Sequence, residues 1–457
     1  MNALVARRES HNDVRMSETM IYDALVIGGG PGGSSTATFL ARGGRRVLVL
    51  EKEFFPRFHI GESLLPYNHE IFRDMGVLPK LEAAGLLKKY GAQFYLGNGS
   101  KMISLVFSNG SFTRHTEAFQ VERASFDHIL LNFARESGAD VREGWTVTRT
   151  VPEADFLTVE ARDPDDKSIC FRARFVIDAS GRGNLTGNQE KLRVIHPQLK
   201  KLAVFGHFSG VRVDTGDKRG DTIIVRLENK WFWLIPLTEH KVSVGCVMDA
   251  DEFARSQGTP EQVFTEIWRS SCVLEERMRT AQLLGKMHTT SDFSYRNQRL
   301  VGHRLLRVGD AAGFMDPIFS AGVYLAMHSG RQAARVVLGA LAEGSDGRRQ
   351  LKRYEAETNR SMRLYWQLVE GYYSKPFLDL FMQPKNKFDI PSAVTAVLGG
   401  ELQGGWRVRW RMWLFFALVA VQKRWPLLPP ISFAPMPPPS PETNEAPASE
   451  PETVPHG

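Results

Sequence analysis

Three apolar runs, each ending in a glycine-rich turn, dominate the hydrophobic pattern of this chain. The first run, Ala24–Ile27, enters the turn Gly28–Gly33 and is followed by the small residues of Ser34–Arg42. A further apolar run spans Arg46–Leu50 and ends at Glu51. Short apolar runs bounded by glycine are typical of buried parallel strands, and small residues let a helix pack closely on them. The pattern therefore predicts a strand–helix–strand unit at the start of the fold.

The other two apolar runs lie far downstream. Phe175–Asp178 precedes the turn Ala179–Gly181, and Leu305–Val308 precedes the turn Gly309–Gly313. The small residues of Val323–Val337 then predict another helix. Similar elements this far apart indicate one discontinuous α/β domain, a Rossmann-like βαβ fold interrupted by insertions.

The two ends of the chain differ in composition from the rest. Residues 1–20 are polar and predict a flexible N-terminal extension. Residues 434–457 hold eight prolines and few large apolar side chains, which predicts a disordered Pro/Glu-rich tail. Between them we expect a discontinuous cofactor domain over 21–340, with an inserted mixed β-sheet for substrate at about 90–120 and 195–300, and a helical region over 341–433.

Composition places the protein among ordinary globular chains, with 42% apolar and 24% charged residues. The tail contributes −4 to a formal net charge of +7, so the rest carries +11 and can attract anionic cofactors, carrier proteins or phospholipids. No basic stripe interleaved with aromatic residues argues for nucleic acid. The cysteines at 170, 246 and 272 are far apart, which predicts neither a disulfide framework nor a metal site and favours a cytoplasmic location.

The first glycine turn carries the chemistry of dinucleotide binding. Gly28 permits the tight turn, Gly30 lets the backbone approach a pyrophosphate, and Gly33 lets helix and strand pack closely. The helix N-terminus offers N–H groups and a partial positive charge to the phosphates. Glu51, at the end of the second strand, is placed to accept a hydrogen bond from a ribose hydroxyl.

The downstream turn adds a second set of cofactor contacts. Asp310 follows the strand Leu305–Val308, where its carboxylate can bind ribityl hydroxyls. The helix that begins after Gly322 can direct its N-terminus at a flavin ring.

Together these motifs resemble the large family of FAD flavoproteins that includes para-hydroxybenzoate hydroxylase and the geranylgeranyl reductases. Gly28–Gly33 with Glu51 are similar to the first motif of that family. Asp178–Gly181 is similar to its middle motif, and Gly309-Asp310 to its second. Arg123 resembles the arginine that such proteins place near the flavin. The resemblance covers most of the chain and implies FAD, rather than NAD, as the bound dinucleotide.

Three further segments resemble one branch of that family, the FADH2-dependent halogenases of phenols and pyrroles. Trp231–Pro236 fits the pattern W-x-W-x-I-P, and Phe314–Gly322 fits F-x-x-P-x-x-S-x-G. Phe55–Pro66 is followed by Lys88–Phe94 at a spacing that resembles halogenases in which the second lysine is catalytic. By this resemblance Lys89 is the catalytic residue.

The resemblance also implies a reaction. Reduced FAD and O2 oxidise chloride or bromide, and Lys89 directs the oxidant to a phenolic ring, as a chloramine or by a hydrogen bond. The backbone of Pro317, Ser320, Ala321 and Gly322, turning into a helix, supplies N–H donors for the halide. No second glycine motif for NAD(P)H is evident, so we expect a separate flavin reductase. The substrate is a small aromatic natural-product intermediate, free or bound to a carrier protein.

The same residues allow plainer interpretations. Lys88 and Lys89 fit a solvated loop, and Trp231 and Trp233 fit a sheet core as well as a wall between flavin and substrate. His59 is interpreted as a packing or phosphate-contacting residue. An FAD monooxygenase, a geranylgeranyl-reductase-like oxidoreductase and a flavin-binding protein without activity stay open, although a hydroxylase has no use for the lysine. The glutamate of tryptophan halogenases cannot be located, which disfavours an indole substrate.

A tryptophan-rich helix is predicted near the end of the chain. Trp406, Trp410 and Trp413 fall at i, i+4 and i+7, on one face of that helix. Either the helix packs its apolar face on the flavin domain, or residues 406–425 form an interfacial helix that contacts anionic membranes or an acidic carrier protein. The apolar run Met412–Val421 is too short to span a bilayer, so no transmembrane segment is expected.

Overall fold

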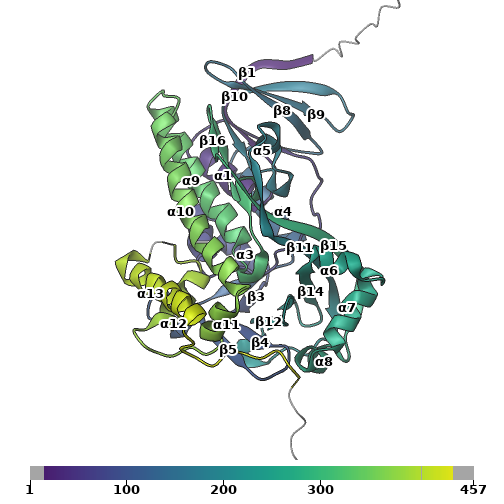
Figure 1. Cartoon of the computed structure of the whole chain (residues 1–457). Helices are drawn as coiled ribbons and strands as arrows, with labels where there is room; N and C mark the ends of the chain where they lie inside the picture. The colour runs from purple at the N-terminus through teal and green to yellow at the C-terminus, as the bar shows by residue number, and fades with distance from the viewer. Residues whose placement is uncertain (1–14, 403, 436–457) are drawn as a thin grey trace, which may run out of the picture.

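Two eight-stranded β-sheets, a two-stranded sheet of β3 and β6, and the helices that cover them make up the described part of the protein (Figure 1). The computed structural model describes residues 15–402 and 404–435. In the first sheet the strands follow the order β16-β17-β10-β1-β2-β7, and β8 and β9 continue from β10. The strands are β1 (Arg15–Ile27), β2 (Val47–Glu51), β7 (Asp140–Glu143), β8 (Thr146–Pro152), β9 (Leu157–Arg162), β10 (Ser168–Asp178), β16 (Val301–Gly302) and β17 (Leu305–Arg307).

The central strands of this sheet are parallel and apolar on both faces. β1 pairs in parallel with β2 and β10, and β10 pairs in parallel with β17. One face is covered by α1 (Pro31–Arg42), α4 (Arg123–Glu136) and α9 (Gly322–Ala342), and the other by the β8–β9 hairpin. Because both faces are buried, these strands read in the sequence as short continuous apolar runs.

The second sheet is mixed and separates two cores. Its order is β18-β15-β11-β14-β13-β12-β4-β5, with β12 and β4 parallel and the other pairs antiparallel. Side chains of β13 alternate, so that Trp231 and Trp233 join the larger core while Phe232 and Leu234 join the smaller one. The strands are β4 (Gly91–Leu96), β5 (Met102–Val106), β11 (Arg193–Ser209), β12 (Thr222–Arg226), β13 (Trp231–Pro236), β14 (Val242–Asp249), β15 (Gln282–Asn297) and β18 (Gly313–Phe314).

Short elements connect the two sheets, and helices complete the fold. The long helices α9 and α10 run side by side, and α13 lies at the edge of the molecule (Figure 1). The remaining elements are α2 (Asn68–Met75), α3 (Leu78–Ala83), β3 (Leu87–Lys89), β6 (Ala118–Gln120), α5 (Leu185–Gln189), α6 (Ala250–Arg255), α7 (Pro260–Arg269), α8 (Cys272–Met278), α10 (Arg348–Tyr372), α11 (Lys375–Phe381), α12 (Ile390–Leu398) and α13 (Gly405–Arg424).

The structure confirms the predicted α/β class, with a parallel βαβ sheet, a second mixed sheet and C-terminal helices. The prediction of a flexible extension is wrong for residues 15–20, which belong to β1. Arg15 and Met16 lie in register with Ile169 and Cys170 of β10, because backbone pairing needs no apolar side chains. Residues 1–14 and the predicted tail from 436 onward lie outside the described residues.

Candidate active site

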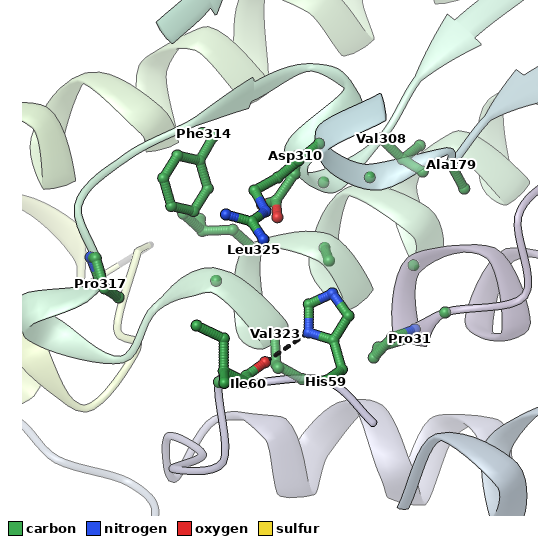
Figure 2. A pocket seen from close by; sticks show the side chains of 18 of the residues that line it. Pro31, His59, Ile60, Ala179, Val308, Asp310, Phe314, Pro317, Val323 and Leu325 are labelled. Carbon is green, nitrogen blue, oxygen red and sulfur yellow. Dashed lines mark hydrogen bonds between the residues drawn. The ribbon is translucent and has the colours of Figure 1, made fainter. Parts of the chain in front are cut away.

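A cavity of about 540 Å³ lies where the carboxyl ends of β1, β10 and β17 meet the N-termini of α1 and α9. Ligands of open α/β sheets bind at this edge because the turns after parallel strands converge there. Figure 2 shows part of the wall, with Pro31 of α1, Ala179 after β10 and Asp310 after β17. The cavity extends to the second sheet, where Trp231 and Trp233 line it.

The first glycine turn forms one end of the cavity by its backbone geometry. Gly28 has a φ of +99°, and a Cβ there would lie 2.5 Å from the carbonyl oxygen of Ala179. A Cβ at Gly33 would lie 1.9 Å from the carbonyl oxygen of Gly28, so α1 can pack here only on a glycine. A Cβ at Gly30 would meet only the end of Arg57, at 3.5 Å. The space beside Gly30 is therefore open for a phosphate at the N-terminus of α1.

Glu51 lies buried in the wall beside this turn. Its Oε2 accepts a hydrogen bond from the backbone N–H of Gly29 at 2.6 Å, and its Oε1 accepts one from Glu53 at 2.9 Å. These bonds fix the carboxylate and leave each oxygen a further acceptor site. A ribose hydroxyl can use that site, as the sequence pattern predicts.

Arg123, at the start of α4, anchors the cavity segment 57–62. Its guanidinium makes two hydrogen bonds to Asp127, at 2.7 and 2.8 Å, and donates to the carbonyl of Ile60 at 2.5 Å. Nδ1 of His59 lies 2.7 Å from the same carbonyl, as the dashed line in Figure 2 marks. Burial, assisted by the charge of Arg123, lowers the pKa of His59 to about 3. His59 is therefore neutral at pH 7, and we interpret it as a residue of the cavity wall rather than as a general base.

Asp310 lies in the turn after β17 and also lines the cavity. Burial raises the pKa of its carboxyl to about 6, against the opposing effect of Arg182 and Arg123. An acidic group at this position can hydrogen-bond to the hydroxyls of a polyol chain, which is the role predicted for it.

All four residues of the predicted halide loop line the cavity where α9 begins. Ser320 takes a left-handed conformation with φ +55°, and Asp316 holds the turn by accepting a hydrogen bond from the N–H of Ile318 at 3.2 Å. A Cβ at Gly322 would meet no atom within 4 Å in the described structure. The backbone therefore faces open space at a helix N-terminus, which is a suitable setting for an anion.

The two predicted lysines have different surroundings although they are adjacent in β3. Lys88 is exposed, and its Nζ lies 3.0 Å from a carboxylate oxygen of Glu117. Lys89 is only 2% exposed and donates hydrogen bonds to Oγ of Ser63 at 2.9 Å and to a backbone carbonyl at 3.3 Å. Burial lowers the pKa of Lys89 to about 8, against the opposing charge of Asp221. Lys88 is thus solvated, as the plainer interpretation expects, but it lies in a strand rather than a loop, and for Lys89 that interpretation is wrong.

Ser63 connects Lys89 to the cavity. Its Oγ lies 2.8 Å from Oγ1 of Thr222, and both residues line the cavity. Hydrogen bonds therefore lead from the buried amine of Lys89 through Ser63 to Thr222 at the cavity wall. Gln120 also donates a hydrogen bond to Oγ1 of Thr222, at 3.0 Å. In the sequence Ser63 stands out only as part of a spacing motif, and Thr222 and Gln120 do not stand out at all. These residues come from β6, β12 and the segment before α2, and no local pattern marks them.

Trp231 and Trp233 are core residues and cavity residues at once. The indole N–H of Trp231 donates to Oη of Tyr373 at 2.8 Å, and Tyr373 donates to Oδ2 of Asp316 at 2.7 Å. The indole N–H of Trp233 donates to Oγ of Ser243 at 3.1 Å. The first set of bonds ties the second sheet to the end of α10 and to the loop before α9. Tyr373 has no signal in the sequence that would have shown this role.

This arrangement defines an FAD-binding flavoprotein. Residues 21–369 match the family model described as an FAD binding domain. The open cradle beside Gly30, the fixed carboxylate of Glu51 and the two helix N-termini fit a flavin dinucleotide. FAD is therefore the cofactor of this protein.

Comparison with known proteins shows to which group of FAD-binding flavoproteins this chain belongs. The 1H-pyrrole-2-carbonyl-[peptidyl-carrier protein] chlorinase of Pseudomonas fluorescens is 30% identical over 416 residues, covering 85% of this chain and 91% of the relative. The tryptophan 2-halogenase of Chondromyces crocatus is 33% identical, covering 70% of this chain and 61% of that protein. The structure of the flavin-dependent brominase Bmp2 matches with a TM-score of 0.78 and 27% identity, covering 89% of this chain and all of that chain. The protein belongs to the flavin-dependent halogenases.

Proposed function

We propose that this enzyme halogenates an electron-rich phenol or pyrrole ring, with Lys89 as the catalytic residue. The observation that carries the proposal is the buried amine of Lys89, held by Ser63 beside the cavity. A pKa of about 8 leaves a fraction of this amine neutral near physiological pH. A neutral amine is a nucleophile, and a hydroxylase would have no use for one at this position.

Different residues of the chain hold the halide, transfer the halogen and exclude water. Bound FAD, once reduced by a separate reductase, supplies with O2 the oxidising equivalents that turn chloride or bromide into a hypohalous acid. The N–H groups at the start of α9 hold the halide. The neutral amine of Lys89 takes the halogen from the hypohalous acid, so that a nitrogen–halogen bond forms, the oxygen–halogen bond breaks and the hydroxyl leaves as water with one hydrogen of the amine. The ring then attacks the halogen and gives up its proton to the nitrogen, which restores the amine, while Ser63 and Thr222 orient that amine. Trp231 and Trp233, which line the cavity, separate the flavin from the substrate and exclude water.

We propose the substrate class from how much of each relative's length this chain matches. The carrier-bound pyrrole chlorinase is matched over 91% of its length, whereas the tryptophan halogenase is matched over 61% of its length. This difference favours a pyrrole over an indole, and the phenolic alternative rests on the resemblance of the segment Lys88–Phe94 to halogenases of phenols and pyrroles. A carrier-bound intermediate and a free one both fit the proposal.

Product analysis tests this function directly. The enzyme is incubated with FAD, a flavin reductase, NADH and a panel of phenols, pyrrole-2-carbonyl thioesters and indoles, with and without chloride or bromide. We expect a product mass shifted by one halogen, with its isotope pattern, only when halide is present. A hydroxylated product that forms without halide would contradict the proposal and identify a monooxygenase.

A further inference from the structure

Helix α13 carries apolar residues on two opposite faces. Its inner face buries Val408, Met412 and Phe415 against α11 and α12. Gln422, at the end of the same stripe, donates a hydrogen bond to Oδ2 of Asp379 at 2.9 Å. The inner face therefore fixes α13 firmly to the protein, and the outer face is free to serve another purpose.

The outer face is aromatic and exposed. Trp406 and Trp413 are 69% and 71% exposed, and Trp410 lies between them on the same face. Phe388, from the loop before α12, is 67% exposed, with its ring centroid 6.4 Å from that of Trp410. Surface helices normally turn polar residues outward, so intramolecular packing does not explain this face. Contiguous exposed aromatic residues mark a contact surface.

All charged side chains of helix α13 are positive. No Asp or Glu occurs between residues 405 and 424. Arg411 donates to the carbonyl of Phe388 at 2.7 Å, which places the loop before α12 beside the helix, with the exposed Lys387 before Phe388 and Asp389 after it. The cationic residues of this surface are Lys385, Lys387, Arg407, Arg409, Arg411, Lys423 and Arg424.

A small apolar cavity lies beside the exposed tryptophans. It measures about 260 Å³ and lies between α10, the end of α12 and α13. Trp413 and Arg409 line it together with the apolar side chains of Leu364, Val397, Met412 and Phe416, and Gln367 and Glu401 add two polar groups to the lining. Its lining is suited to a few methylene groups near a cationic side chain, which is the chemistry of a phospholipid.

We propose that the outer face of α13 docks the enzyme on an anionic phospholipid surface. Tryptophan rings lie at the level of the headgroups, and the arginines contact lipid phosphates. An acidic carrier protein would match the charge as well, but exposed tryptophans beside an apolar cavity favour lipid. Within the described ranges, no helix is both long and apolar enough to cross a membrane.

Co-sedimentation of the full chain with vesicles tests the proposal. We expect binding to vesicles of equal parts phosphatidylglycerol and phosphatidylcholine at low salt, and little binding to phosphatidylcholine alone. Trp406→Ser with Trp413→Ser should weaken the partition about tenfold. Arg407→Gln with Arg409→Gln should weaken it by a similar factor, roughly tenfold, and reduce its salt dependence. The matched controls are Arg348→Gln with Arg353→Gln, two exposed arginines on α10, and Leu284→Ser on β15, and both should bind like wild type.

FAD content and halogenation of a soluble substrate verify that each variant is folded. If the tryptophan variant loses FAD, the arginine variant carries the test, because its side chains are exposed. The proposal is overturned if the intact enzyme fails to bind anionic vesicles, or if the α10 control weakens binding as much as the α13 variant. It is also overturned if an acidic carrier protein binds the tryptophan face while the vesicles do not.

Discussion

The two ends of the cavity are built in different ways. The phosphate end uses the backbone of consecutive residues, Gly28–Gly33, with one carboxylate, Glu51. The lysine end uses side chains that come from β3, β12 and the segment before α2, joined by the hydrogen bonds of Lys89, Ser63 and Thr222. In the function proposed above, the first end binds a cofactor that many proteins share, and the second takes part in halogen transfer only. Changes at the two ends should therefore separate cofactor binding from halogen transfer.

The largest effect is expected at the phosphate end. Gly30→Val places a branched side chain in the open space beside α1 and should abolish FAD binding, measured by flavin absorbance after purification and by titration. Gly339→Ala in α9 is the control, because a Cβ there meets no described atom within 4 Å and alanine favours a helix. A folded Gly30→Val protein with unchanged FAD affinity would remove this assignment.

The next effect concerns the side chain between Lys89 and the cavity. Ser63→Ala removes a hydrogen bond to the buried amine, which should lower halogenation about tenfold while flavin oxidation continues. Product formed per flavin oxidised is the measurement. Ser104→Ala is the control, because Oγ of Ser104 is buried and has no hydrogen-bond partner among the described residues. Equal coupling in both variants would show that Ser63 does not position the lysine.

The pKa of Lys89 predicts how halogen transfer depends on pH. Because the folded pKa lies near 8, the neutral amine increases as pH rises through that value. The single-turnover halogenation rate should rise several-fold from about pH 7 to 9 and then level off, whereas flavin oxidation should lack this inflection. A rate that falls over the same range would identify the protonated lysine, acting by a hydrogen bond, as the active form.

The smallest effect is expected where the two sheets are tied together. Tyr373→Phe leaves the indole N–H of Trp231 and Oδ2 of Asp316 without that partner, and should lower the free energy of unfolding by about 1–3 kcal/mol. Tyr372→Phe is a matched control, because Oη of Tyr372 is buried and has no hydrogen-bond partner in the part of the chain described. Urea denaturation measures both. A similar decrease in the free energy of unfolding for both variants would show that the hydrogen bonds of Tyr373 do not stabilise the protein.

The phosphate end could be predicted from the sequence because its chemistry is local. Gly28, Gly30, Gly33 and Glu51 lie within one βαβ unit, and each has a steric or hydrogen-bonding reason that spacing alone reveals. The loop that we propose to hold the halide lies at the cavity for the same reason, since its residues are consecutive and lead into α9.

The lysine end could be predicted only in part because its contacts are long-range. The spacing selected Lys89, but no local pattern shows that Lys89 is buried while Lys88 is exposed. Thr222 and Tyr373 reach the site only through the pairing of the second sheet and the end of α10. In α13 the spacing of the tryptophans predicted one apolar face correctly, but it could not show that Val408 and Met412 form the face that packs inward.

The catalytic role proposed for Lys89 is best tested by comparing the two adjacent lysines. Lys89→Ala and Lys88→Ala are assayed together for FAD binding, flavin oxidation and halogenated product, with a substrate that the wild-type enzyme halogenates. We predict that Lys89→Ala binds and oxidises FAD like wild type but forms no product halogenated at the native position, while Lys88→Ala keeps most of its activity. Native-site halogenation by Lys89→Ala at the wild-type rate would contradict the account and leave Lys89 as a buried structural residue.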